Sequence, residues 1–384
     1  MRPDPDRHTH ALLSAAIALL LQCLATLEAQ STFVASLAVA PLLALISGEI
    51  ARPVDSDGAE SCPSWLCDAV SCTLQVVAGG DAPGAGPSAD TQRTVERVQA
   101  ASHNRQQVRL AGGLAALATA ARRSLAVLEG GRHAEDSAIA LRHMVLMQQA
   151  AWAFAHLLAA GPATGDEEGE SAFAPTLAGL LRLRSPSAAI AACAAVGQIC
   201  RGGTSRQDAV RSAGAIPAIV ELLRSGKTET LQLHALAALS AAVASNPAGQ
   251  NVARDAGALR VVVALLADTR YGCAGYGSWE LLVPQHSAMC AMYLIANNPT
   301  SQAALREAGG AAALSALARS PGGVPQVGEA ARTAQSVLQI IEPPAPPPVE
   351  VTGAEVSRVG GSTGTRSRVV VPVDETEMGG GTTV

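Results

Sequence analysis

The residue types that carry out catalysis occur in the sequence, but their spacing matches no common catalytic motif. The only lysine, Lys227, follows the single glycine Gly226, whereas a phosphate-binding loop needs a longer glycine-containing run before its lysine. The eight histidines are scattered, and the HExxH pattern of zinc proteases is absent. We therefore expect a non-catalytic protein that needs no cofactor, and keep an enzyme as the least favoured alternative.

Eight cysteines are spread thinly over the 384 residues, unlike those of a disulfide-rich secreted domain. Cys62, Cys67 and Cys72 are five residues apart, which on a helix rotates each by about 500° from the last. The three thiols would therefore spiral around the helix instead of converging. Zinc sites usually pair cysteines two to four residues apart. We expect the cysteines to be small apolar residues and predict no metal site.

The composition favours helices that pack closely through small side chains. Hydrophobic residues make up 48% of the chain but aromatic residues only 2%, and strands favour β-branched and aromatic residues. The formal net charge is −5, whereas nucleic-acid binders are usually basic because they neutralise phosphates. These observations predict an all-α protein that does not bind nucleic acid.

The segment from Ala11 to Leu27 is apolar and nearly uncharged. It is short for a membrane span of about 20 residues, and Asp4 and Asp6 offset the positive charge that a signal peptide carries. We expect residues 1–30 to form a capping helix of the fold, with a cytoplasmic or nuclear protein as the consequence. The alternative is a secretory signal or membrane anchor, and residues 11–27 are the only expected route to membrane association.

Three segments repeat one pattern, with a short helix, an Ala-Gly pair, an amphipathic helix, a polar loop and an Ala-rich helix. They are residues 207–246, residues 250–298 and a copy that begins at Gln302. Gly214 and Gly257 are 43 residues apart, whereas Gly257 and Gly309 are 52 apart. The difference indicates an insertion of about ten residues, at 268–284.

Weaker copies of the pattern lie upstream, at residues 32–77, 104–162 and 173–200. About six three-helix units therefore span residues 31–342, which predicts an α-solenoid. Further insertions are expected near 79–90 and 161–170. Residues 343–384 are rich in proline and glycine, and we expect this tail to be disordered.

The best-defined unit resembles the armadillo-repeat family. The motifs are Ala213-Gly214-Ala215-Ile216-Pro217, Leu222-Leu223 and residues 235–243, and the resemblance covers roughly residues 31–342. It implies a right-handed superhelix whose third helices line a concave groove. HEAT repeats are the nearest alternative, but three helices and a glycine in each unit favour armadillo.

Armadillo proteins of the importin-α type bind basic peptides through Trp and Asn residues four apart on their third helices. Trp152 occupies a Trp position here, but His156 replaces the asparagine. The other pairs are Ala194/Gln198, Ala237/Ala241 and Cys290/Leu294. The ladder is missing, so recognition of nuclear-import cargo is not expected. Trp152, His156 and Gln198 are candidate partner contacts, and packing of Trp152 between repeats is the alternative.

The insertion at 268–284 holds Tyr271, Tyr276 and Trp279. Aromatic side chains are enriched in binding hot spots, so these three are further candidate contacts, unless the insertion only covers its own repeat. Five arginines, at positions 182, 184, 201, 206 and 211, form either a solvated face or a site for an acidic partner.

The sequence thus predicts a protein–protein interaction scaffold without a small-molecule substrate. The partner would lie in the groove or on the aromatic insertion. The alternative is a specialised adaptor, such as a nucleotide exchange factor of heat-shock chaperones or a substrate adaptor of a ubiquitin ligase.

Overall fold

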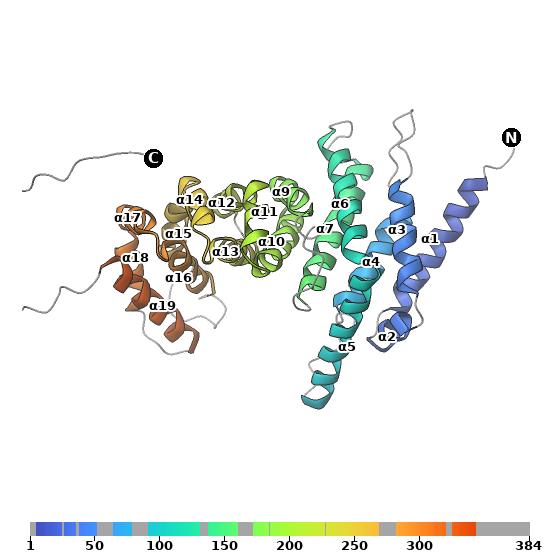
Figure 1. Cartoon of the computed structure of the whole chain (residues 1–384), viewed down its shortest axis with the longest axis horizontal. Coiled ribbons are helices and arrows are strands. Elements are labelled where there is room, and N and C mark those ends of the chain that lie inside the picture. Colours follow the sequence, from blue (N-terminus) through green and yellow to red (C-terminus); the bar gives the residue numbers. More distant parts are fainter. Residues whose placement is uncertain are drawn as a thin grey trace, which may run out of the picture. The chain divides into compact units, whose positions relative to one another are not determined.

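A computed structural model shows that helices build the chain (Figure 1). The chain divides into Met1–Pro343 and Pro344–Val384, and the tail predicted to be disordered lies outside the described residues. The structure describes residues 5–24, 27–35, 38–51, 64–78, 91–130, 137–159, 172–183, 185–226, 228–268, 282–319 and 325–342. These residues contain no strand.

The helices repeat in threes, and the predicted six units are confirmed. One helix, α1, precedes the units, and the third unit has only its second and third helices among the described elements. The bounds are α1 Pro5–Cys23; α2 Leu27–Ala35, α3 Val39–Ala51, α4 Ser64–Ala78; α5 Thr91–Leu110, α6 Gly113–Glu129, α7 Ala138–Leu158; α9 Ala174–Arg182, α10 Pro186–Arg201; α11 Thr204–Ser212, α12 Ala215–Ser225, α13 Glu229–Val243; α14 Pro247–Asp255, α15 Ala258–Leu266, α16 Leu282–Ile295; α17 Pro299–Glu307, α18 Gly310–Ala318, α19 Pro325–Ile341.

Equivalent helices of successive units pack against each other in rows. The third helices form one row, in which each of α4, α7, α10, α13, α16 and α19 packs against the next. The second helices α3, α6, α9, α12, α15 and α18 form another row. One continuous apolar core of mainly alanine, leucine and valine runs between the rows. This is the nearest-neighbour packing of a solenoid, and its core contains few large aromatic residues.

The apolar segment at 11–27 is not one helix. Helix α1 ends at Cys23 and α2 begins at Leu27. Helix α1 packs against α4, and Ile17 and Leu24 are buried in the core. None of the described helices combines the length and the hydropathy that crossing a bilayer would need.

A glycine ends the first helix of each complete unit from α5 onward. Gly214 has φ 76° and Gly257 has φ 85°, and Gly112 and Gly309 adopt the same left-handed conformation. Residues with a Cβ are strained in that region. The left-handed residue turns the chain directly into the second helix.

Two Asn-Pro pairs, Asn246-Pro247 and Asn298-Pro299, begin helices α14 and α17. Helices α13 and α16 already end at Val243 and Ile295. Asn298 then caps α17 by accepting a hydrogen bond from the Ser301 N–H at 3.1 Å, and Asn246 caps α14 in the same way. A proline at the first helical position loses nothing because its missing N–H would have no partner there.

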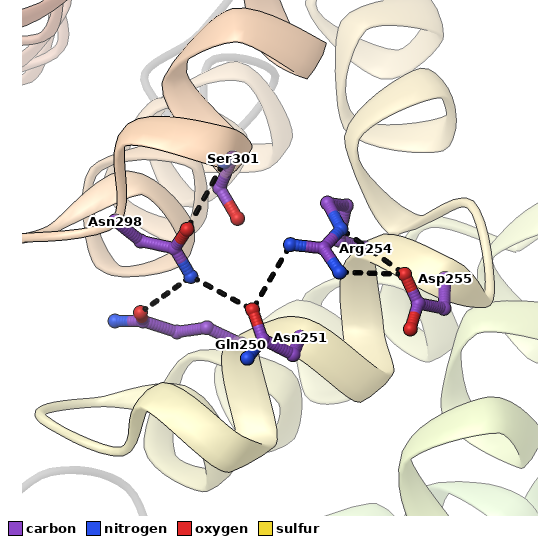
Figure 2. A network of polar contacts seen from close by, with 6 residues as sticks. All are labelled: Gln250, Asn251, Arg254, Asp255, Asn298 and Ser301. Carbon is purple, nitrogen blue, oxygen red and sulfur yellow. Dashed lines mark hydrogen bonds and ion pairs between the residues drawn. The ribbon is translucent and has the colours of Figure 1, made fainter. Parts of the chain in front are cut away.

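A glutamine on the first helix of a unit forms hydrogen bonds to backbone groups at the end of a third helix. The Gln250 amide donates to the carbonyl oxygens of Tyr293 (2.9 Å) and Ala296 (3.2 Å) at the end of α16. Its Oε1 accepts from the Asn298 Nδ2 at 3.2 Å, within the network of Figure 2. Gln207 bonds in the same manner to the end of α13, the third helix of its own unit. Gln302 instead bonds to Ile295 of α16, the third helix of the preceding unit. These bonds satisfy helix-end carbonyls that have no partner within their own helix.

Candidate functional site

One face of the third-helix row carries the half-buried residues that could meet a partner. They recur four residues apart on each helix, as positions on one helix face do. This third-helix face consists of Trp152 and His156 on α7, Ala194 and Gln198 on α10, Ala237 and Ala241 on α13, and Met289 and Tyr293 on α16.

The pair predicted on α16, Cys290 and Leu294, is wrong by one residue. Both side chains are completely buried, whereas Met289 and Tyr293 are half-buried. The insertion before α16 disrupts the spacing from which the position was counted. The pairs on α7, α10 and α13 do lie on the half-buried face.

Trp152 lies at the centre of an aromatic cluster that joins two helices. Its ring centroid is 6.2 Å from that of His156 on α7 and 5.9 Å from that of His234 on α13. The second contact is edge-to-face, at 84°. Helix α10 packs against both α7 and α13, so Trp152 and His234 meet although their helices belong to units that are not consecutive. Trp152 also packs against the core, so the structural role considered for it applies as well.

The two imidazoles of this cluster are held towards their neutral forms. Burial lowers the pKa of His156, and the positive charge of Arg105 lowers it further. Burial also lowers the pKa of His234. Around Trp152, the face therefore presents neutral rings near pH 7.

These histidines should make the stability of the folded chain depend on pH. Their folded-state pKa values lie below the unfolded value of about 6.5, so the unfolded chain binds more protons. Their contribution is complete above about pH 6.5 and is lost as the pH falls towards the folded-state values. We expect the Tm to fall more between pH 7.5 and pH 5.5 in the native chain than in a His156→Gln/His234→Gln variant.

The control is His103→Gln at an exposed position, which should keep the full pH dependence of the native chain. Thermal melts followed by circular dichroism at the two pH values measure the difference. An identical change of Tm in the native chain and the double variant would contradict the expectation.

Negative charge is nearly absent from the helices that form the face. Helices α7, α10, α13 and α16 contain one carboxylate between them, Glu229 at the start of α13. They also carry two arginines, Arg142 and Arg201, and four histidines, His143, His156, His234 and His286. The scarcity of carboxylates on these helices suits the binding of an uncharged peptide segment better than that of a basic one.

The described residues include possible metal ligands and nucleophilic thiols, whose surroundings can be compared. These residues contain no group of three or more His, Cys, Asp or Glu placed to hold a metal ion. Burial raises the pKa of the Cys72, Cys193, Cys200 and Cys290 thiols to about 12. Since the thiolate is the reactive and metal-binding form, these four cysteines are packing residues.

Part of the predicted site lies outside the described residues, namely Tyr271, Tyr276, Trp279 and also Arg184. The other arginines of the predicted cluster do not share one environment. Arg206 is buried, Arg211 pairs with Asp208 at 3.1 Å, and Arg182 is exposed.

His234 was not predicted as a site residue, because it occupies neither position of the Trp/Asn pair on α13, which are Ala237 and Ala241. The only sequence signal is that α13 carries a histidine at the position equivalent to His286 of α16. Its approach to Trp152 depends on how three successive units pack.

Comparison with known proteins finds similar structures but no match to a protein-family model or a curated protein. An engineered protein matches with a TM-score of 0.53 and 18% identity, over 79% of this chain and 97% of its own. A designed armadillo repeat protein matches with a TM-score of 0.52 and 22% identity, over 77% and 99%.

A second designed armadillo repeat protein, solved in complex with the peptide (KR)4, has a TM-score of 0.52 and 20% identity, over 77% and 98% of the two chains. At such identities the similarity concerns the fold. The rows of three-helix units and the left-handed glycine of each complete unit from α5 onward agree with it. The chain therefore has the armadillo-repeat fold.

Proposed function

We propose that the protein is a non-catalytic scaffold whose third-helix face binds an uncharged, largely apolar segment of a partner protein. The Trp152 cluster is the observation that carries this proposal. An indole flanked by two neutral imidazoles offers a rigid apolar contact surface, and such aromatic anchors dominate many interfaces. The small residues Ala194, Ala237 and Ala241 beside it leave the backbone of a bound segment room to approach.

The partner segment should differ from the basic peptide bound by the designed relative. A basic segment is best held by carboxylates, and the third helices of the face contribute only Glu229. An apolar segment avoids this requirement, because removal of its surface from water supplies the binding free energy. Gln198 adds an amide that can bond to a peptide backbone.

Quantitative affinity purification with the full chain tests the proposal. Trp152→Ala and Gln198→Arg should each reduce capture of a true partner by about tenfold or more, which corresponds to about 1.4 kcal/mol. Gln198→Arg leaves the core packing of Trp152 intact, so its effect separates binding from stability. The matched control is Leu110→Ala, because Leu110 is 75% exposed and distant from the face in sequence.

A second pair of variants examines the aromatic insertion as the alternative contact. If it anchors the partner, Tyr276→Ala with Trp279→Ala should abolish capture and leave the Tm nearly unchanged. A partner that these variants lose but Trp152→Ala retains would move the binding site to the insertion. Capture that survives both sets of substitutions would overturn the proposed function.

A further inference from the structure

A second surface lies where the second helices turn into the third helices. A pocket of about 510 Å³ opens between α9 and α10 on one side and α12 and α13 on the other. One unit further along, a pocket of about 580 Å³ opens between α12 and α15. Gly226, which directly follows α12, lines both pockets. We call the two together the α12 groove.

The first pocket of the α12 groove is mainly apolar. Its walls include the buried side chains of Leu181 and Leu231 and the half-buried Leu222 and Ala218. A pocket of this size and lining can take one large aliphatic or aromatic side chain, whose removal from water would stabilise a complex.

Some of the charged side chains around the groove form ion pairs with each other. Glu221 forms an ion pair with Arg224, which also donates to the Ala256 carbonyl oxygen at 3.1 Å. Asp255 pairs with Arg254 at 2.9 Å. Asp268 is the third acidic residue of the lining.

Two further arginines line the groove. Arg182 lines the first pocket and Arg260 lines the second. Both are exposed, and within the part of the chain that the structure describes neither forms a hydrogen bond or an ion pair. The groove thus offers, on the two sides of α12, two guanidinium groups that have no partner among the described residues. Guanidinium groups bind carboxylates with a strong and directional pair of hydrogen bonds.

We propose that the α12 groove binds a short acidic segment of a partner protein, with a large apolar side chain in the first pocket and carboxylates on Arg182 and Arg260. This surface belongs to the second-helix edge and shares no residue with the third-helix face. It would let the scaffold hold two segments of different chemistry at once.

Selection from a phage-displayed library of random octapeptides, panned against the full chain, tests the proposal. The enriched peptides should carry Leu, Ile or Phe flanked by Asp or Glu. In fluorescence anisotropy with the synthetic peptide, Arg182→Glu with Arg260→Glu should weaken binding by at least about tenfold. The affinity should also fall as the NaCl concentration rises, since exposed charge pairs are screened.

A pocket-filling variant and a matched control complete the design. Ala218→Leu adds side-chain volume at the half-buried wall of the first pocket and should weaken the same peptide. Arg332→Glu makes the same charge change at an exposed position on α19 and should leave the affinity within about twofold. Circular dichroism confirms folding of each variant, and the double glutamate variant decides the outcome if Ala218→Leu is unstable.

The proposal is overturned if no acidic-apolar consensus is enriched, or if such peptides bind the double glutamate variant as tightly as the native chain. Its outcome is independent of the proposed function. Trp152→Ala should not affect peptides of the α12 groove, and Arg182→Glu should not affect segments held on the third-helix face.

Discussion

Replacing Gln250 with leucine is expected to lower the free energy of unfolding by about 2–4 kcal/mol. Gln250 is 1% exposed, and leucine is similar in volume but has no polar atoms. The substitution would leave the carbonyl oxygens of Tyr293 and Ala296 without their donor and the Asn298 amide without one acceptor. A buried polar group that loses its partner keeps the full cost of leaving water. Figure 2 shows Gln250 of the fifth unit beside Asn298, which caps the first helix of the sixth unit.

Urea denaturation followed by circular dichroism measures the change. Because solenoids can unfold in parts, hydrogen exchange should also locate the weakening at the end of α16 and the start of α17. Gln302→Leu is the matched comparison, since Gln302 bonds to the single carbonyl oxygen of Ile295 and is only half-buried. Equal losses for Gln250→Leu and Gln302→Leu would contradict the account.

The second large effect is expected at Phe154. Phe154→Ala should destabilise the chain by about 3–5 kcal/mol, the usual cost of removing a fully buried phenylalanine ring. The Phe154 and Phe173 rings are both completely buried, and their centroids are 4.3 Å apart. Phe154 belongs to α7 and Phe173 caps α9, so the ring pair joins the second unit to the third.

A double-mutant cycle with Phe154→Leu and Phe173→Leu separates the ring contact from simple burial. We expect a coupling free energy of about 0.5–1.5 kcal/mol, as measured for other aromatic pairs. Leu141→Ala on the same helix, where Leu141 is 48% exposed, should change the stability by less than about 0.5 kcal/mol. Additive effects of the two phenylalanine substitutions would show that the ring contact itself contributes nothing.

The repeat architecture could be predicted from the sequence because its signals are local. A glycine such as Gly214 ends a helix through its own backbone conformation, and the apolar face of residues 215–225 is visible as a helical period. The same reasoning located Trp152 and Gln198 on the half-buried face. It failed at α16, where the insertion at 268–284 broke the count, so that Met289 and Tyr293 replace the predicted pair.

Features that depend on packing between units could not be predicted. His234 meets Trp152 although α10 packs between their helices, so this contact depends on how three successive units are arranged. Likewise, Arg182 and Arg260 are 78 positions apart in sequence and come to line one groove through the packing of α9, α12 and α15. No periodicity within a single helix reports such contacts.

The first-helix residue that bonds to the end of a third helix also limits how far the units can be exchanged for one another. Gln207, Gln250 and Gln302 each stand seven residues before the left-handed glycine of their unit, and Arg105 occupies the same position before Gly112, where it bonds to the end of α4. Arg105 and Gln302 reach the third helix of the preceding unit, so the second unit grafted to another place would bring an arginine to a junction where glutamine otherwise stands. The second unit is therefore matched to its own junction by the longer, positively charged side chain of Arg105. Exchange of units should be tolerated best among the fourth, fifth and sixth units, which all carry glutamine at this position.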